Sequence, residues 1–336
     1  MGKLLSRVKL KLLMISFSCL VISLALLNLY TLPMRSRLAP TNKLPHIYKF
    51  NSVRLGLRPS GVPNVVNPFI FFHQRKAGGS SVRNWIKMAA HNINRTIYIP
   101  CLQEIHCETY YTPQMSTSTA AVVYGGHFYY MPFQRTMLLH HHEDEKNGLR
   151  VLVNPLKHDF TCLTVFREPL DRIQSCWNFR FIQTNPIKNS GMRELSNMTV
   201  EEIRSGLLHG RYQYGEGCLN EPMRIFSDIG INEDLVNELA TIDPAIAELA
   251  MSQTIERSGT CVVAILERCE DSKIAIAKYL PFLAEFYACD SQYVNEGKVG
   301  KGELSEEQIG VIKDVGKFEF LAYEQANLML DEQMSN

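Results

Sequence analysis

The chain has 336 residues, with 35 lysines and arginines, 34 aspartates and glutamates, nine cysteines and 46% hydrophobic content. That length suits one large domain or two small ones, and the composition excludes a disordered tail, a fibrous protein and a disulfide-built miniprotein. The net charge of +1 hides an asymmetry: residues 1–103 hold 15 basic and no acidic side chains, whereas residues 212–336 hold nine basic and 23 acidic ones. The basic front end suits anionic partners.

The first predicted element is a membrane anchor. Residues 12–32 carry no charged side chain, and about 20 such residues in a helix span the hydrocarbon core of a bilayer. Four basic residues precede this stretch, which favours a cytosolic N-terminus. A cleaved signal peptide is the competing interpretation, but its apolar stretch would be about 7–15 residues long and would end in small residues. The expected order is a cytosolic tail at 1–11, a transmembrane anchor at 12–32, a stem at 33–66 and a lumenal domain at 67–336.

Glycosylation sequons and cysteines agree with a lumenal domain. The sequons begin at Asn94 and Asn197, and each has a threonine two positions later. Eight cysteines lie beyond the anchor, and an oxidising lumen permits disulfide bonds between them. Cys101 and Cys107 are close together beside a predicted loop, so they are the first pair we expect. The alternative for other cysteines, such as Cys162 in an apolar strand, is a buried free thiol.

Residues 67–330 predict one α/β domain. Short apolar runs indicate buried strands, and capped or Pro-initiated segments indicate helices. We expect strands at 68–73, 120–124, 161–166 and 260–266, and helices at 80–91, 169–182, 271–283 and from a capping box at Ser305 to about residue 330. Strands that alternate with helices favour a parallel sheet covered on both faces, with ligands at the carboxyl ends of the strands.

The segment after the first strand has the features of an anion-binding loop. Gly78 and Gly79 allow close approach of a ligand to the backbone, and Lys76 adds a full charge. Ser80 and Ser81 add hydroxyl donors at a helix start, where the dipole contributes about 0.3–1 kcal/mol. The nucleoside-triphosphatase loop is excluded, because there the lysine follows the glycines. The alternative is an ordinary strand–helix turn with a solvated lysine.

A second strand–helix junction adds two more candidates. Arg167 stands at the carboxyl end of a predicted strand, and Ser175 lies in the helix that follows. Arg167 as a charged fork and Ser175 as a neutral donor can converge on one phosphate. Arg172 lies on the helix face of Ser175, but the role we expect for it is an ion pair with Glu168, four residues earlier.

These two segments resemble the paired cofactor motifs of Golgi sulfotransferases that use 3′-phosphoadenosine 5′-phosphosulfate. In that family a Lys-x-Gly-Gly-Ser/Thr-Ser/Thr loop holds the 5′-phosphosulfate, and it is similar to residues 76–81 here. An Arg-Asp/Glu-Pro-x-x-Arg-x-x-Ser junction holds the 3′-phosphate, and it is similar to residues 167–175. The chain most resembles the heparan sulfate and uronyl 2-O-sulfotransferases, with further similarity at residues 177–180 and 266–272. The resemblance implies the sulfotransferase fold, which is a P-loop-like parallel sheet flanked by helices, and a single-pass type II protein of the Golgi membrane.

The resemblance also implies the residues of the site. Ala77 stands where the family often has Thr, which removes one hydroxyl near the sulfonate, and Arg75 replaces a frequent Pro or Gln, which adds charge. The cofactor-binding residues that we expect are Arg75, Lys76, Ala77, Gly78, Gly79, Ser80, Ser81, Arg167 and Ser175. Lys76 is also expected to be catalytic, by stabilising the bridging oxygen of the leaving phosphate. No metal is expected.

Transfer to a hydroxyl needs a base that titrates near neutral pH, and histidine is the natural choice. His127 follows a predicted strand in a Gly-His-aromatic segment, and the 2-O-sulfotransferases carry a similar segment in which the His is the base. We expect His127 to be the base, and the alternative is a core histidine in an aromatic cluster. His73 is the next candidate, although it is expected to support the loop. The three histidines at 140–142 resemble a metal site, but an acidic run follows them and a solvated loop is expected.

The acceptor implied by the resemblance is a glycosaminoglycan, modified at the 2-OH of a uronic acid. A polyanion needs a basic groove, and the candidate residues near the two motifs are Arg83, Lys87, Arg95, Arg180, Lys188, Arg204 and Arg211. Two alternatives stay open: transfer to another sugar hydroxyl, on a glycosaminoglycan or an N-glycan, and a non-catalytic lumenal carbohydrate-binding protein on the same scaffold. Nucleic acid is not an expected partner, and a homo-oligomer is left open.

Overall fold

The computed structural model describes residue 57 and residues 59–64, 67–99, 121–130, 160–179, 193–210, 217–289 and 302–335. The predicted tail, the predicted anchor and most of the predicted stem lie outside these residues. No helix within the described part is long and apolar enough to cross a bilayer. The expected pair of Cys101 and Cys107 and the histidines at 140–142 also lie outside it.

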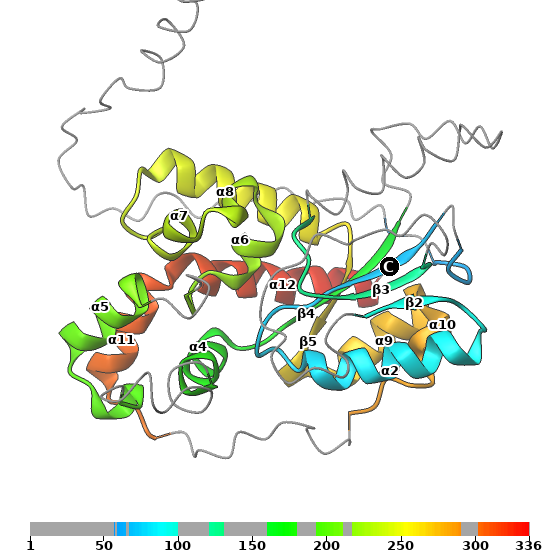
Figure 1. Ribbon diagram of the computed structural model, residues 1–336, viewed down its shortest axis with the longest axis horizontal. Coiled ribbons are helices and arrows are strands. Elements are labelled where there is room, and N and C mark those ends of the chain that lie inside the picture. Colours follow the sequence, from blue (N-terminus) through cyan, green and yellow to red (C-terminus); the bar gives the residue numbers. More distant parts are fainter. Residues whose placement is uncertain are drawn as a thin grey trace, which may run out of the picture. The chain divides into compact units, whose positions relative to one another are not determined.

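Parallel strands form the centre of the domain, in the order β2-β3-β1-β4-β5 among the described residues (Figure 1). They are β1 (Phe69–Phe72), β2 (Ile97–Tyr98), β3 (Val123–Gly126), β4 (Thr161–Phe166) and β5 (Val262–Ile265). The predicted α/β class with a parallel sheet is confirmed. The sequence predicts four of these strands and misses β2, which has two residues. β3 begins three residues later than predicted.

The strand order creates a switch point beside β1. β1 pairs with β3 on one side and with β4 on the other. β2 lies beyond β3, whereas β5 lies beyond β4, so the connections that follow β1 and β4 lead in opposite directions. In open parallel sheets, ligands bind outside the carboxyl ends of the strands at such a point. Both predicted motifs follow strands that meet there.

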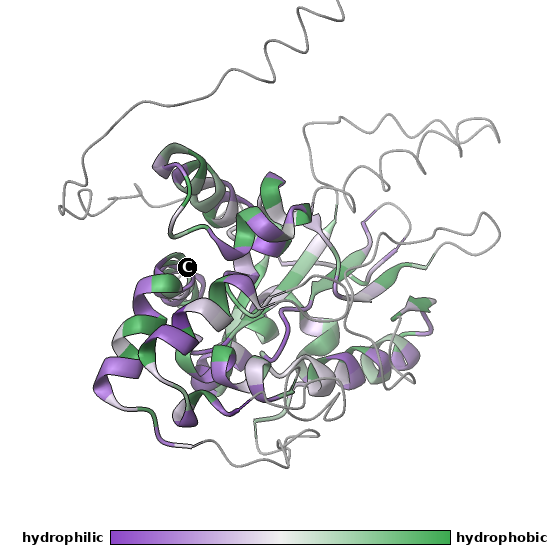
Figure 2. Cartoon of the chain, turned by 60° about the vertical axis from the view of Figure 1, so that its left-hand side comes forward, coloured by the Kyte–Doolittle hydropathy of each residue, from purple (hydrophilic) through white to green (hydrophobic). Residues whose placement is uncertain are grey.

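Helices cover both faces of the sheet. Strand side chains alternate between the faces, so Phe69 and Phe72 of β1 point in opposite directions. Phe69 packs against Phe282 of α10 with 5.1 Å between ring centroids, and Phe72 packs against Phe226 of α6 with 5.5 Å. The helices are α2 (Gly79–Asn92), α4 (Pro169–Trp177), α5 (Val200–His209), α6 (Glu221–Phe226), α7 (Glu233–Asn237), α8 (Pro244–Ser258), α9 (Cys269–Tyr279), α10 (Pro281–Ala284), α11 (Glu306–Val315) and α12 (Lys317–Ser335). Figure 2 shows hydrophobic residues along the central strands and mixed colouring on the surrounding helices.

Two of the predicted helices are each divided in the structure. The capping box at Ser305 is present and opens α11, because the Ser305 side chain accepts from the Gln308 backbone and the Gln308 side chain accepts in return. Gly316 then separates α11 from α12. Pro281 separates α9 from α10, because proline disfavours helical geometry in the residue before it. α4 ends at Trp177, Asn178 and Phe179 continue it in π-helical geometry, and the predicted end at residue 182 lies outside the described residues.

Described cysteines form three disulfide bonds. Cys162 bonds to Cys261, which joins β4 to the residue before β5, and Cys269 bonds to Cys289. The third bond joins Cys176 of α4 to Cys218, which precedes α6. The disulfides expected from the cysteine content are therefore present in this part of the chain, and the alternative of a free thiol at Cys162 is wrong.

Candidate functional site

The loop between β1 and α2 turns sharply through left-handed backbone. Lys76 has φ 63° and Gly78 has φ 75°. Glycine adopts this conformation without strain, whereas a lysine seldom does unless its surroundings hold it there. Gly78 is the N-cap residue of α2 and has no side chain to accept hydrogen bonds from the first turn. The loop therefore presents the start of a helix at the carboxyl end of β1, as an anion-binding loop requires.

The position of the His73 ring explains why residue 79 is a glycine. A Cβ atom at this position would lie 1.7 Å from Nε2 of His73, so the imidazole fills the space beside the Gly79 backbone. Gly78 has a second constraint besides its φ angle, because a Cβ there would lie 2.9 Å from a methyl group of Leu266. The sequence explains both glycines by approach of a ligand, and the structure adds a packing reason for each.

The two predicted motifs meet at the switch point. Arg167, directly after β4, donates from Nη1 to the carbonyl oxygen of Lys76 over 3.1 Å. Its Nη2 donates to Asp171 over 3.3 Å, and its Nε lies 4.0 Å from a carboxylate oxygen of Glu267. Arg167 thus joins the ends of β1 and β4 and has two acidic neighbours that any phosphate would have to compete with.

The other loop residues differ in their exposure. The Lys76 ammonium lies 3.9 Å from the ring centroid of Phe179, directly after α4. Ala77 and Ser81 are buried, whereas Ser80 is half-buried. Ser175 is half-buried on α4, and among the described residues no hydrogen bond joins it to Arg167 or to the loop. The predicted convergence of Arg167 and Ser175 on one phosphate therefore stays a prediction.

His127 and His73 form a stacked pair at the same edge of the sheet. His127 follows β3 and His73 follows β1, and their rings stack with 4.1 Å between centroids. Nδ1 of His127 lies 2.9 Å from the carbonyl oxygen of His73. A carbonyl can only accept, so Nδ1 of His127 carries the proton and its Nε2 is left as an acceptor. This is the tautomer that a base needs.

Both rings are held neutral. Burial lowers the pKa of His73 well below its usual value, and the neighbouring His127 and Arg83 lower it further. Burial, with a contribution from Arg83, lowers the pKa of His127 to about 3, although Glu221 partly opposes this. A base with that pKa is weak, and an anion placed beside the ring would raise the pKa. The environment of His127 therefore couples proton uptake to the binding of a negatively charged ligand.

Arg83 belongs to this site. The sequence places it among the residues of an exposed acceptor groove, but its side chain is buried on the first turns of α2. Its Nη2 lies 3.4 Å from the Ser80 hydroxyl, and its charge acts on both histidines. Arg204, another groove candidate, forms an exposed ion pair with Asp314 at 2.7 Å. Arg180, Lys188 and Arg211 lie outside the described residues, whereas Lys87 is half-buried and Arg95 is exposed.

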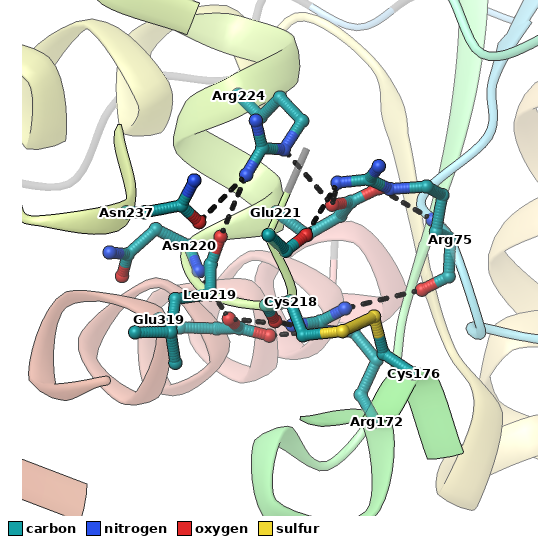
Figure 3. Close-up of a disulfide and its surroundings, with 11 residues drawn as sticks. Arg75, Arg172, Cys176, Cys218, Leu219, Asn220, Glu221, Arg224, Asn237 and Glu319 are labelled. Atoms are coloured by element: carbon teal, nitrogen blue, oxygen red, sulfur yellow. Dashed lines mark hydrogen bonds and ion pairs between the residues drawn. A yellow bond between two sulfur atoms is a disulfide. The ribbon is translucent and has the colours of Figure 1, made fainter. Parts of the chain in front are cut away.

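The guanidinium of Arg75 is paired with a buried carboxylate. Its Nε and Nη2 each donate over 2.6 Å to the two carboxylate oxygens of Glu221, and both side chains are buried (Figure 3). Direct contact between the Arg75 guanidinium and a ligand would require breaking this pair. Arg75 therefore also connects the loop to α6, and its expected part in binding the nucleotide stays a prediction.

The predicted pair of Arg172 with Glu168 is wrong. Arg172 is buried and pairs with Glu319 of α12, with 2.9 Å between Nη2 and Oε2 (Figure 3). Glu168 instead caps α4 by accepting from the backbone N–H of Asp171 over 2.7 Å. Sequence reasoning missed Glu221 and Glu319, because a buried acid within a helix has the same local pattern as an exposed one.

The two sequon asparagines lie on the surface. Asn94, in left-handed backbone after α2, and Asn197, before α5, are both exposed. The threonine of the second sequon, Thr199, caps α5 through a hydrogen bond from Glu202. Exposure of both asparagines is compatible with glycosylation.

Within the described residues, no group of histidines, cysteines and acids is arranged to hold a metal ion. No protein-family model matches the chain, and no curated protein matches it. The geometry of the switch point is therefore the ground on which a function can be proposed.

Proposed function

We propose that this protein transfers the sulfonate of 3′-phosphoadenosine 5′-phosphosulfate to a sugar hydroxyl of a glycosaminoglycan, at the 2-OH of a uronic acid. One observation carries the proposal. The hydrogen bond from Arg167 to the Lys76 carbonyl brings the two basic strand ends together, at the switch point where a parallel sheet binds its ligands.

The residues present fit a nucleotide that carries negative charge at both its 5′ and its 3′ end. Lys76 and the first-turn N–H groups of α2 would hold the 5′ end, and Arg167 with Ser175 would hold the 3′-phosphate. The buried guanidinium of Arg83 adds positive charge between the loop and the histidines. The nucleotide supplies an activated sulfonate to this site. The chain itself supplies charge, orientation and a base.

The residues have separable tasks in the transfer. Nε2 of His127 accepts the proton of the acceptor hydroxyl as its oxygen bonds to sulfur, and the His73 carbonyl keeps that nitrogen unprotonated beforehand. Lys76 stabilises the negative charge that gathers on the bridging oxygen as the S–O bond breaks. Most of the remaining acceleration comes from positioning the two reactants. The proposed location is the Golgi lumen, on a type II membrane anchor.

Labelled sulfonate transfer tests this proposal. The protein is incubated with labelled nucleotide and a panel of desulfated polysaccharides, and disaccharide analysis identifies the modified hydroxyl. We expect label at the 2-OH of a uronic acid. Label elsewhere on the sugar would change the acceptor, and carbohydrate binding without transfer would support a non-catalytic protein instead.

Lys76→Ala is the sharpest variant for this assay. Removing one charge-stabilising donor costs about 10²–10³ in rate, and we expect that loss with an intact fold. Lys278→Ala is the control, because that ammonium also lies near a ring, 5.3 Å from the centroid of Tyr279. Near-full turnover of Lys76→Ala would overturn the assignment.

Arg167→Ala should weaken nucleotide binding more than acceptor binding, which calorimetry with each ligand measures.

A further inference from the structure

Both carboxylate oxygens of Glu221 contact Arg75, the residue at the start of the phosphate loop. Its Oε1 accepts from both the backbone N–H of Arg75, over 2.9 Å, and the Nε of Arg75, over 2.6 Å. Its Oε2 accepts from Nη2 of the same arginine, over 2.6 Å. One carboxylate therefore holds both the backbone and the side chain of the residue that directly precedes Lys76.

The backbone of Arg75 has lost its strand partners at this point. β1 ends at Phe72, and His73 makes the last ladder bond, from its N–H to the Gly126 carbonyl over 2.9 Å. A buried N–H beyond the ladder needs another acceptor, and Glu221 provides it. The next residue, Lys76, is in left-handed backbone. The contact with Glu221 thus fixes the chain where it leaves the sheet and turns.

Glu221 is itself held from several directions. Cys218 is bonded by its disulfide to α4, and its carbonyl accepts from Arg172 (Figure 3). The backbone N–H of Asn220 donates to Glu319 of α12 over 2.7 Å. These bonds fix the short segment that leads into α6, whose first residue is Glu221. Through these bonds and its own contact with Arg75, Glu221 connects the loop to α4 and α12.

The carboxylate keeps its charge in this environment. Burial raises the pKa of Glu221, but the charge and hydrogen bonds of Arg75, with Arg224 and Arg172, outweigh burial and hold the pKa well below its usual range. Nε of Arg224 lies 3.3 Å from Oε2, so a second guanidinium shares the carboxylate. An uncharged side chain in place of Glu221 would leave Arg75 and Arg224 buried without their counter-ion.

We infer that Glu221 is a positioning residue for the phosphate loop, which orients Lys76 by holding Arg75 through both its backbone and its guanidinium. This inference rests on the proposed function, because the loop is the part that would bind the sulfonate donor. Glu221 touches no reacting atom, and its hydrogen bonds to the loop are all made to Arg75. Its loss should therefore disturb the loop before it disturbs the remainder of the domain.

Glu221→Gln tests the inference, with Glu319→Gln as a matched control. Both carboxylates are buried and each pairs with an arginine, but Glu319 reaches the loop only indirectly, through the Asn220 backbone beside Glu221 and through Arg172, whose Nη1 lies 3.5 Å from the Arg75 carbonyl. We expect both variants to unfold at lower temperature. Glu221→Gln should lose roughly 10² in kcat/KM for the nucleotide, as small misplacements of reacting groups do, with KM for the acceptor unchanged, and Glu319→Gln should lose much less.

Amide hydrogen exchange of the nucleotide-free protein separates this inference from the proposed function. In Glu221→Gln the amides of residues 75–79 should exchange faster than in wild type, whereas in Glu319→Gln the increase should be much smaller because that contact with the loop is indirect. Unchanged exchange in Glu221→Gln, or equal changes in both variants, would overturn the positioning role. Absence of transfer in wild type would overturn the function and leave the exchange result standing. If Glu221→Gln does not fold, Arg75→Lys keeps the charge without the two-pronged contact and carries the same expectation.

Discussion

Two clusters of buried polar side chains contact the segment between β1 and α2, and they differ in how completely their polar atoms are paired. In the charged cluster, both oxygens of Glu221 accept from Arg75, and Arg224 approaches the same carboxylate. In the histidine cluster, Nδ1 of His73 is buried without a hydrogen-bond partner among the described residues. A fully satisfied network fixes structure, whereas an unsatisfied buried group is costly and marks a place with another role.

The same depth of burial produces opposite charge states in the two clusters. Glu221 stays ionised because guanidinium groups surround it, whereas His73 and His127 stay neutral because burial and nearby cations disfavour their protonated forms. A nearby group of opposite charge therefore decides whether a buried side chain stays charged or becomes neutral. The charged cluster can therefore support the loop permanently, while the histidine cluster can take up a proton when negative charge arrives.

The largest expected effect comes from removing the base. His127→Ala should reduce turnover by about 10²–10⁴, as loss of a general base does, while the protein still binds adenosine 3′,5′-bisphosphate. Turnover with labelled donor and calorimetry with the bisphosphate measure the two parts. His209→Ala is the control, because that ring is exposed and lies 3.5 Å from Glu238 on the surface. Unchanged turnover would move the base elsewhere, with His73 the next candidate.

Gly79→Ala disturbs the packing of the His73–His127 pair without removing either ring. The new Cβ would lie within 2.4 Å of three His73 ring atoms, so the ring must move and its stack with His127 must break. We expect turnover to fall and the free energy of unfolding to drop by about 1–3 kcal/mol, as in other overpacked sites.

Gly310→Ala in α11 provides the control for this substitution, since a Cβ there meets nothing within 4 Å. Alanine at an unhindered helix position should stabilise the protein by about 0.5–1 kcal/mol. Denaturant unfolding of both variants measures the contrast. A Gly79→Ala variant as stable and as active as wild type would show that His73 can leave its place without consequence.

Local patterns in the sequence predict the part of the site that follows the strands. The run Phe69–Phe72, the two glycines and the position of Arg167 after an apolar strand suffice to place both motifs at one sheet edge. Partners far apart in sequence are not predictable in this way. Glu221 is 146 residues from Arg75, and nothing in its own helix indicates that it is buried. The incorrect pairing of Arg172 has the same cause, because local spacing favours Glu168 while tertiary packing brings Glu319.

The smallest expected effect is on the pH dependence of stability, and it sharpens the contrast in charge state. The usual pKa of histidine is 6.5, and His127 has a folded-state pKa of about 3. Between these values the unfolded chain binds a proton that the folded protein does not, so stability falls as pH decreases, by about 1.4 kcal/mol per pH unit for each such histidine.

Glu221 adds to the loss of stability only at lower pH, below the usual pKa of 4.5 for its unfolded state, since its own folded-state pKa is lowered. Denaturant unfolding between pH 6.5 and 5 therefore measures the histidines against the opposite contribution of Glu319, whose pKa is raised by burial. His127→Asn should remove about half of the slope contributed by the pair. An unaltered slope in His127→Asn would mean that the folded-state pKa of this ring is not lowered, which would remove the contrast in charge state between the two clusters.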